Sequence, residues 1–166
     1  MVKINHATLA DLDAIMAIER AGFSEEEAGT PEAFRQRIEL LPDTFLVARD
    51  GDRVVGFIVG PASREKYVND DMYEHTSRNF PIGGHQLILS IAVAPDYRGQ
   101  GLGSELLAGI EEVARLAFRE TISLTSLEKN VPFYEKNGFT KAGVSTSDHA
   151  GEVWYNMVKV LTVKHI

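Results

Sequence analysis

The chain of 166 residues contains no cysteine, and that absence excludes several kinds of chemistry. It can form no disulfide, use no thiolate nucleophile and offer no cysteine ligand to zinc. It also lacks an apolar run long enough to span a bilayer, and its amino end lacks the basic and apolar stretches of a secretion signal. These absences predict a cytoplasmic protein without a membrane partner.

Positive charge is also in short supply. Asp and Glu number 24 against 17 Lys and Arg, which gives a formal net charge of -7. Binding to nucleic acid needs a surplus of Lys and Arg on one surface, so we expect no nucleic acid partner. A cationic small molecule suits an acidic protein better. The histidines are scattered without the spacing of metal ligands, and no metal is expected.

What is present fits a single domain over residues 1–166, because 44% of the residues are hydrophobic and no repeat, low-complexity tract or linker interrupts them. Thr8 with Asp11 resembles a capping box that opens a helix, Thr30-Pro31 begins a second helix, and Asp50-Gly51-Asp52 predicts a hairpin turn. Strands are expected at residues 2–7, 44–49, 53–60, 86–93, 121–126, 139–146 and 153–161. Helices are expected up to about residue 21, from residue 31, after residue 102 and at 131–137, with a short one around 65–75.

A glycine-rich turn follows the most apolar of these strands. The run at 86–93 is typical of a central strand covered on both faces, and the turn after it reads Arg98-Gly99-Gln100-Gly101-Leu102-Gly103-Ser104. Glycines let the main chain approach a ligand closely, and the unpaired N–H groups at a helix start attract anions. The turn therefore predicts a site for a phosphate or pyrophosphate. A plain tight turn, with glycines that serve helix packing, is the alternative.

Two common nucleotide sites are disfavoured by what this turn lacks. A P-loop needs a lysine after the turn, where this chain has Leu102-Gly103-Ser104. A dinucleotide fingerprint needs a third glycine at the position of Ser104.

Two blocks of sequence carry a resemblance to a known superfamily. The segment from Ile91 to Gly103 resembles the coenzyme A signature of the GNAT acetyltransferases, in which Arg98, Gly101 and Gly103 match the conserved core. Downstream, Asn130 to Phe139 resembles the "FYEKxGF" segment of the same superfamily. Nearly the whole chain is similar to the arylalkylamine N-acetyltransferase family in particular.

The resemblance implies a GNAT fold of the mixed α/β class, with a mostly antiparallel central sheet flanked by about four helices. A central strand would splay from its neighbour and leave a cleft in which the co-substrate acetyl-CoA lies like an extra strand. Ile91, Ala92 and Val93 match that strand and would bind the pantetheine arm. The N–H of Val93 would polarise the thioester carbonyl.

The remaining residues of the implied cofactor site follow that strand. The amides from Arg98 to Ser104 would hold the pyrophosphate, and Phe133 would contact the cofactor. Asn130 matches a position that often does so in relatives, although it is also a candidate cap for the following helix.

The implied reaction is direct attack of an amine on the thioester, which needs a base for the ammonium proton and an acid for the thiolate. Tyr134 matches the family's general-acid tyrosine. The family's two histidines are replaced here by Leu87 and Leu89. His85 lies two residues before Leu87, so strand alternation would place it on the same face, and it is the candidate base. The alternatives are an exposed loop histidine at this position and loss of the proton to solvent.

These features predict an N-acetyltransferase acting on the primary amine of a small molecule, with arylalkylamines and polyamines as candidate classes. A peptide amine as the acceptor, or an acetyl-CoA sensor without turnover, are the alternatives. An apolar wall for an aromatic amine is a further hypothesis, formed by Tyr67, Met72, Tyr73 and Phe80. The acidic run Glu25-Glu26-Glu27 is interpreted as solvated surface, and a monomer or homodimer is expected.

Overall fold

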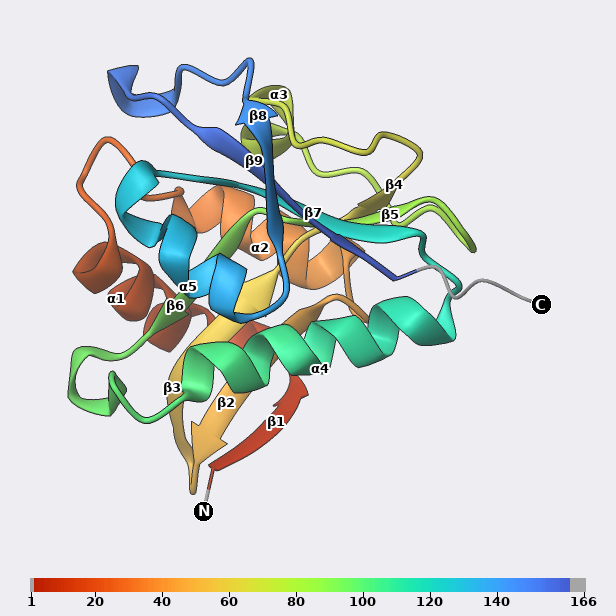
Figure 1. Ribbon diagram of the computed structural model, residues 1–166. Helices are drawn as coiled ribbons and strands as arrows, with labels where there is room; N and C mark the ends of the chain where they lie inside the picture. Colours follow the sequence, from red (N-terminus) through yellow and green to blue (C-terminus); the bar gives the residue numbers. More distant parts are fainter. Residues whose placement is uncertain (1, 162–166) are drawn as a thin grey trace.

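The computed structural model describes residues 2–161, and over this range the strands form two sheets that meet in the middle of the molecule (Figure 1). The first sheet is antiparallel throughout and has the order β1 (Val2–His6), β2 (Phe45–Asp50), β3 (Arg53–Val59) and β6 (Ser90–Val93). The second has the order β4 (Ala62–Ser63), β5 (His85–Ile88), β7 (Thr121–Ser126), β9 (Tyr155–Val160) and β8 (Thr140–Val144). In the second sheet only β5 and β7 pair in parallel, so the expected mostly antiparallel sheet is confirmed.

Helices cover both faces of this layer (Figure 1). One face carries α1 (Leu12–Gly22) and α2 (Pro31–Leu40), and the other carries α4 (Leu102–Leu116) and α5 (Val131–Lys136). A single turn, α3 (Asp71–Glu74), is all that forms of the helix expected around 65–75. Short 3-10 turns lie at Leu9–Asp11, Pro95–Tyr97, Glu128–Asn130 and His149–Gly151.

The local signals at the first two helices are confirmed. The backbone N–H of Thr8 donates to the Asp11 carboxylate over 2.8 Å, and Arg49 of β2 pairs with the same carboxylate over 2.6 Å. The hydroxyl of Thr30 accepts a hydrogen bond from the N–H of Ala33 over 3.1 Å. Each motif satisfies backbone groups that a helix start leaves unpaired, so the residues that form it determine where the helix begins.

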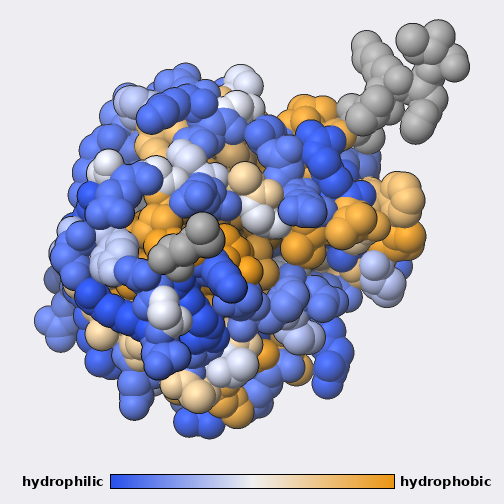
Figure 2. Space-filling model, turned by 90° about the horizontal axis from the view of Figure 1, so that it is seen from below, coloured by the Kyte–Doolittle hydropathy of each residue, from blue (hydrophilic) through white to orange (hydrophobic). Residues whose placement is uncertain are grey.

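The main core lies between α1, α2 and the first sheet. The rings of Phe34, Phe45 and Phe57 form its aromatic centre, with the centroids of Phe34 and Phe57 5.6 Å apart in an edge-to-face arrangement. Apolar residues of α4 close the opposite face. Figure 2 shows a mostly hydrophilic surface, on which hydrophobic residues gather in the centre and on the right of the view.

The central apolar run departs from the sequence prediction. Residues 86–93 were expected to form one strand, but β5 and β6 are separate strands that pair in different sheets and meet at Leu89. The N–H of Leu87 donates to the carbonyl of Pro61, whereas the N–H of Leu89 donates to that of Val59. At this crossing Gly60 lies so close to β5 that a Cβ on it would stand 1.9 Å from the Leu87 carbonyl oxygen. The chain therefore changes neighbours at Leu89, and glycine at position 60 permits the close approach.

Gly60→Ala should destabilise the fold, because its methyl group would overlap the main chain of β5. We expect the free energy of unfolding to fall by about 3 kcal/mol or more, measured by urea denaturation. Gly22→Ala is the control, since its Cβ would meet Arg98 and Ala92 at ordinary distances of 3.6 and 3.7 Å. Equal stability of the two variants would contradict the close crossing.

Candidate functional site

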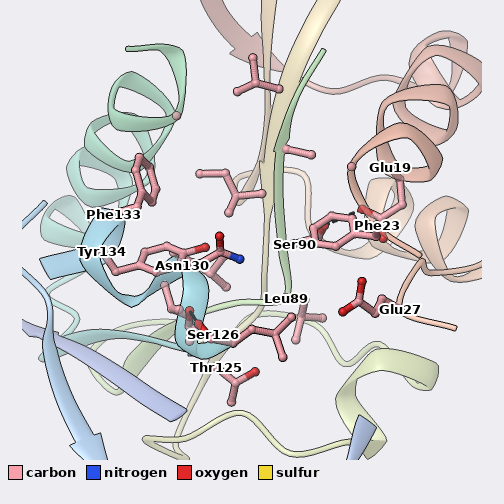
Figure 3. A pocket seen from close by; sticks show the side chains of 18 of the residues that line it. Glu19, Phe23, Glu27, Leu89, Ser90, Thr125, Ser126, Asn130, Phe133 and Tyr134 are labelled. Carbon is pink, nitrogen blue, oxygen red and sulfur yellow. Dashed lines mark hydrogen bonds between the residues drawn. The ribbon is translucent and has the colours of Figure 1, made fainter. Parts of the chain in front are cut away.

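A cavity of about 580 Å³ opens where the two sheets diverge. The parallel ladder between β5 and β7 ends at the pair Ile88 and Leu124, after which β6 pairs with β3 and leaves β7. Figure 3 shows side chains that enter from both faces of the layer. Phe133, Asn130 and Tyr134 lie on one side of the strand that carries Ser90, and Glu19, Phe23 and Glu27 lie on the other. The cavity therefore connects the face covered by α4 and α5 with the face covered by α1 and α2.

The structure brings nearly all the sequence-predicted cofactor residues to this cavity. Its lining includes Ile91, Ala92, Val93, Arg98, Gly99, Gly101, Leu102, Gly103, Ser104, Asn130 and Phe133. Gln100 is the member of that set that the lining does not include.

The glycines of the turn are required for two different reasons. Gly99 and Gly101 have φ angles of 79° and 82°, in the left-handed region that favours glycine, and Gly101 is the N-cap of α4. A Cβ on either would meet no atom within 4 Å, so the space beside them is open. A Cβ on Gly103, by contrast, would lie 3.0 Å from the ring of Phe133. The turn thus combines an accessible helix start with a glycine that serves packing.

The side chain of Arg98 is turned back onto the protein. Its Nε donates to the carbonyl of Val93 over 3.3 Å, and Nη2 approaches the carbonyl of Ala21 at 3.5 Å. These contacts connect the turn to β6 and to the end of α1. Anion binding at the turn would therefore depend on the backbone N–H groups at the start of α4.

Alternation along β6 indicates which backbone groups face the cavity. The N–H of Ala94 donates to the carbonyl of Val55 over 2.8 Å. Because N–H groups of alternate residues point to the same neighbour in an antiparallel ladder, that of Ala92 also points to β3, whereas those of Ile91 and Val93 point away from it. β6 is the last strand of its sheet, so the amides of Ile91 and Val93 face the gap.

Tyr134 lies across the cavity from the acidic residues of α1 and the loop after it (Figure 3). Burial, and to a smaller extent the negative charge that Tyr73 would carry when ionised, raises the pKa of the Tyr134 phenol, so the hydroxyl stays protonated. Asn130 is the N-cap residue of α5, but its side chain makes no capping hydrogen bond and lines the cavity.

His85 does not reach the cavity, and the structure does not support it as the base. Its Nδ1 is 2.8 Å from the hydroxyl oxygen of Thr121, and its Nε2 is 3.7 Å from a carboxylate oxygen of Glu120. His85 begins β5, whereas the lining of the cavity begins on this segment at Ile88. Three residues of extended chain span about 10 Å, so the alternation that aligned His85 with Leu87 and Leu89 does not bring it to the gap.

Glu19 is a site residue that the sequence analysis missed. Its side chain is 3% exposed and lines the cavity, where it accepts hydrogen bonds from the Ser90 hydroxyl over 2.7 Å and the Gly29 N–H over 2.9 Å. Burial raises the pKa of this carboxyl, although the two hydrogen bonds and the nearby Arg37 and His149 oppose the shift. A signal existed, because a glutamate seven residues after Leu12 falls on the apolar face of α1.

Three loops meet at the same end of the cavity. The ring of His149 stacks on that of Tyr73, with centroids 5.4 Å apart, and His149 Nε2 lies 3.2 Å from the carbonyl oxygen of Glu27. Trp154 donates its indole N–H to the carbonyl of His149 over 2.8 Å. Of the proposed apolar wall only Tyr73 lines the cavity, while Tyr67, Met72 and Phe80 do not. Glu27, interpreted as solvated surface, also lines it.

Two further searches of the described residues bear on the class of site. None of the helices over residues 2–161 combines the length and the apolar character needed to cross a membrane. In the same part of the chain, no three His, Asp or Glu side chains gather as a metal site would require.

Comparison with known proteins agrees with this geometry. A glucosamine 6-phosphate N-acetyltransferase of Trypanosoma brucei brucei is 45% identical over 56 residues, which are 34% of this chain and 37% of that protein. The GphF GNAT-like decarboxylase in complex with isobutyryl-CoA superposes with a TM-score of 0.82 at 17% identity, covering 95% of this chain and 98% of that one. The NatC complex bound to Gag peptide and CoA superposes with a TM-score of 0.74 at 18% identity, covering 97% of this chain and 99% of that one. At such low identities the two structures show a common fold and nothing finer.

The family pattern described as "Acetyltransferase (GNAT) domain" matches residues 42–141, more than half of the chain. This stretch contains β6, the glycine turn, β7 and Tyr134, which together form much of the cavity wall. The chain therefore belongs to the GNAT acetyltransferase domain family.

Proposed function

We propose that this protein transfers the acetyl group of acetyl-CoA to the primary amine of a small molecule. One observation carries the proposal: a single cavity passes between β6 and β7, with the glycine turn at the start of α4 on one face and a buried carboxylate on the other. Such a passage lets an acyl donor and an acceptor approach the same point from opposite faces. We call the side of the cavity on which Glu19 and Glu27 lie the acceptor face (Figure 3). Small acceptors are favoured because the loops that carry Glu27 and His149 are in contact on this face.

The residues present fit coenzyme A. The open space beside Gly99 and Gly101 would admit the pyrophosphate to the first amides of α4, and the free side of β6 would bind the pantetheine arm. The N–H of Val93, which points into the gap, would stabilise the oxyanion that forms as the thioester is attacked. Asn130 and Phe133 would contact the cofactor from the side of α5.

Glu19 and Tyr134 supply the two proton transfers that the reaction needs. Glu19 accepts a proton from the ammonium of the acceptor, directly or through a water molecule, and frees the nitrogen lone pair. A bond then forms between this nitrogen and the acetyl carbon, and the carbon–sulfur bond breaks. The hydroxyl of Tyr134, kept protonated by burial, donates to the departing thiolate, and the second proton that the acylated nitrogen must lose returns to the Tyr134 oxygen, directly or through a water molecule.

Tyr134→Phe tests the acid. Release of free thiol from acetyl-CoA would be measured against tryptamine, phenethylamine, spermidine, amino acids and short peptides. We expect turnover on small amines and a fall in kcat of about 100-fold in the variant, because the thiolate loses its proton donor. Tyr155→Phe, on β9 and outside the cavity, should keep full activity. Turnover on peptides alone would move the function to protein acetylation, and acetyl-CoA binding without any product would favour a sensor.

Glu19→Gln tests the base. The carboxyl accepts a proton only when ionised, and its pKa is raised, so wild-type kcat/KM should fall as the pH drops through that raised value. In the variant we expect kcat to fall by about 100-fold and this acidic limb of the pH profile to disappear. Glu26→Gln, on an exposed residue outside the cavity, is the control. An unchanged pH profile in Glu19→Gln would rule out Glu19 as the base.

Gly101→Ala tests the anion site. Alanine is strained at a φ of 82°, so the first amides of α4 should move, and we expect the KM for acetyl-CoA to rise about tenfold. Gly51→Ala introduces similar strain at a φ of 61° in the β2–β3 turn, away from the cavity, and should leave this KM unchanged. The same KM in both variants would show that the turn does not hold the cofactor.

A further inference from the structure

Arg37 is a buried cation in the wall of the same cavity. Its side chain, in the last turn of α2, is 1% exposed, and the guanidinium lies over the ring of Phe34 at 4.7 Å. Nη2 donates to the carbonyl of Tyr73 over 2.9 Å, and Nε has no partner within residues 2–161. A guanidinium offers five N–H groups in a planar fork, so most of its donor capacity is unused.

No carboxylate of the described residues neutralises this charge by direct contact. The Glu19 carboxylate interacts electrostatically with Arg37, but no ion pair within 4 Å joins the two side chains. The two carboxylate oxygens of Glu19 instead accept hydrogen bonds from the Ser90 hydroxyl and the Gly29 N–H. Buried arginines are normally paired, because removing a charge from water is costly. A cation held in a cavity wall without an anion beside it is a receptor for an anionic ligand group.

The position of Arg37 assigns that group to the acceptor. Its hydrogen-bond partner Tyr73 stacks on His149 and, through its hydroxyl, reaches Thr125 of β7 over 3.1 Å. His149 lies 3.2 Å from the carbonyl oxygen of Glu27, and Figure 3 shows Glu27 and Glu19 on the same side of the strand that carries Ser90. The helix start that fits a pyrophosphate, that of α4, lies on the other side of this strand. We propose that Arg37 binds an anionic group of the acceptor, so that the preferred substrate is an amine that also carries a carboxylate or a phosphate.

This assignment rests on the proposed acetyl transfer and narrows its substrate class. The ammonium of the acceptor would approach Glu19 while its carboxylate or phosphate accepts from the free N–H groups of Arg37. Glu27, Tyr73 and His149 are other titratable groups at this end of the cavity. Simple polyamines, which carry no anion, would leave Arg37 unpaired and would be poorer substrates.

Arg119 provides a matched control. It is also buried, at 6% exposed, its Nε also lacks a partner, and its Nη1 donates to one backbone carbonyl, that of Gly83, over 2.9 Å. It does not line the cavity. An unpaired Nε alone therefore does not mark a binding site, and the location of Arg37 is what distinguishes the two residues.

The experiment compares substrate pairs that differ in the anion. Acetylation of phenylalanine against phenethylamine tests a carboxylate, and glucosamine 6-phosphate against glucosamine tests a phosphate. Wild-type kcat/KM should be at least about tenfold higher for the anionic member of one pair. Arg37→Lys, which keeps the charge but loses the fork, should raise KM for that member about tenfold or more and leave its uncharged partner and kcat nearly unchanged. Arg119→Lys should alter neither.

Three results would overturn the assignment. The first is a wild-type preference for the uncharged member of both pairs. The second is an equal effect of Arg37→Lys on both members of the preferred pair, which would mean that Arg37 acts through Glu19 or through packing. The third applies if no amine is acetylated. Phenylalanine and glucosamine 6-phosphate would then be titrated by calorimetry into protein saturated with coenzyme A, and the absence of binding would overturn the assignment. Binding that Arg37→Lys weakens, without turnover, would support the anion site and contradict the acetyl transfer. Should Arg37→Lys fail to fold, judged by loss of acetyl-CoA binding, the wild-type preference decides.

Discussion

The change of neighbours at Leu89 is the constraint on which the rest of the site depends. Up to Ile88 the chain pairs with β7, and from Ser90 it pairs with β3, so one continuous segment belongs to two sheets. Gly60 permits this crossing because no side chain separates it from the main chain of β5. β6 and β7 must then diverge, and a passage opens through the layer that otherwise would have been closed by a strand ladder.

The passage gives the two faces of the protein different tasks. On one face, the start of α4 presents unpaired amides, and Tyr134 of α5 keeps its proton because it is buried. On the other face, Glu19 is buried under the loop after α1, and Arg37 of α2 lies in the same wall. A donor and an acceptor that enter from opposite faces would meet beside β6. The charges proposed to serve the acceptor are therefore separated by the sheet from the site that fits a pyrophosphate.

The sequence predicted the features that depend on residues close together in the chain. The capping box at Thr8, the hairpin at Gly51 and the glycine turn at Gly101 each follow from local backbone requirements. His85 was expected at the site and lies outside the cavity, because strand alternation says which face a side chain takes but not where the strand changes sheets. Arg37 and the His149 loop were missed because tertiary packing, which no local pattern encodes, brings them to the cavity. Of these residues, only Glu19 had a signal in the sequence, because it is a charged residue on the apolar face of a helix.

The central claim is that the gap between β6 and β7 holds acetyl-CoA with its thioester between Tyr134 and Glu19. A crystal structure of the protein with coenzyme A bound tests it most directly. The account predicts the pyrophosphate at the first amides of α4, the pantetheine arm along the free side of β6, and the sulfur within hydrogen-bonding reach of the Tyr134 hydroxyl. Coenzyme A bound outside this gap, or with its sulfur directed away from Tyr134, would contradict it.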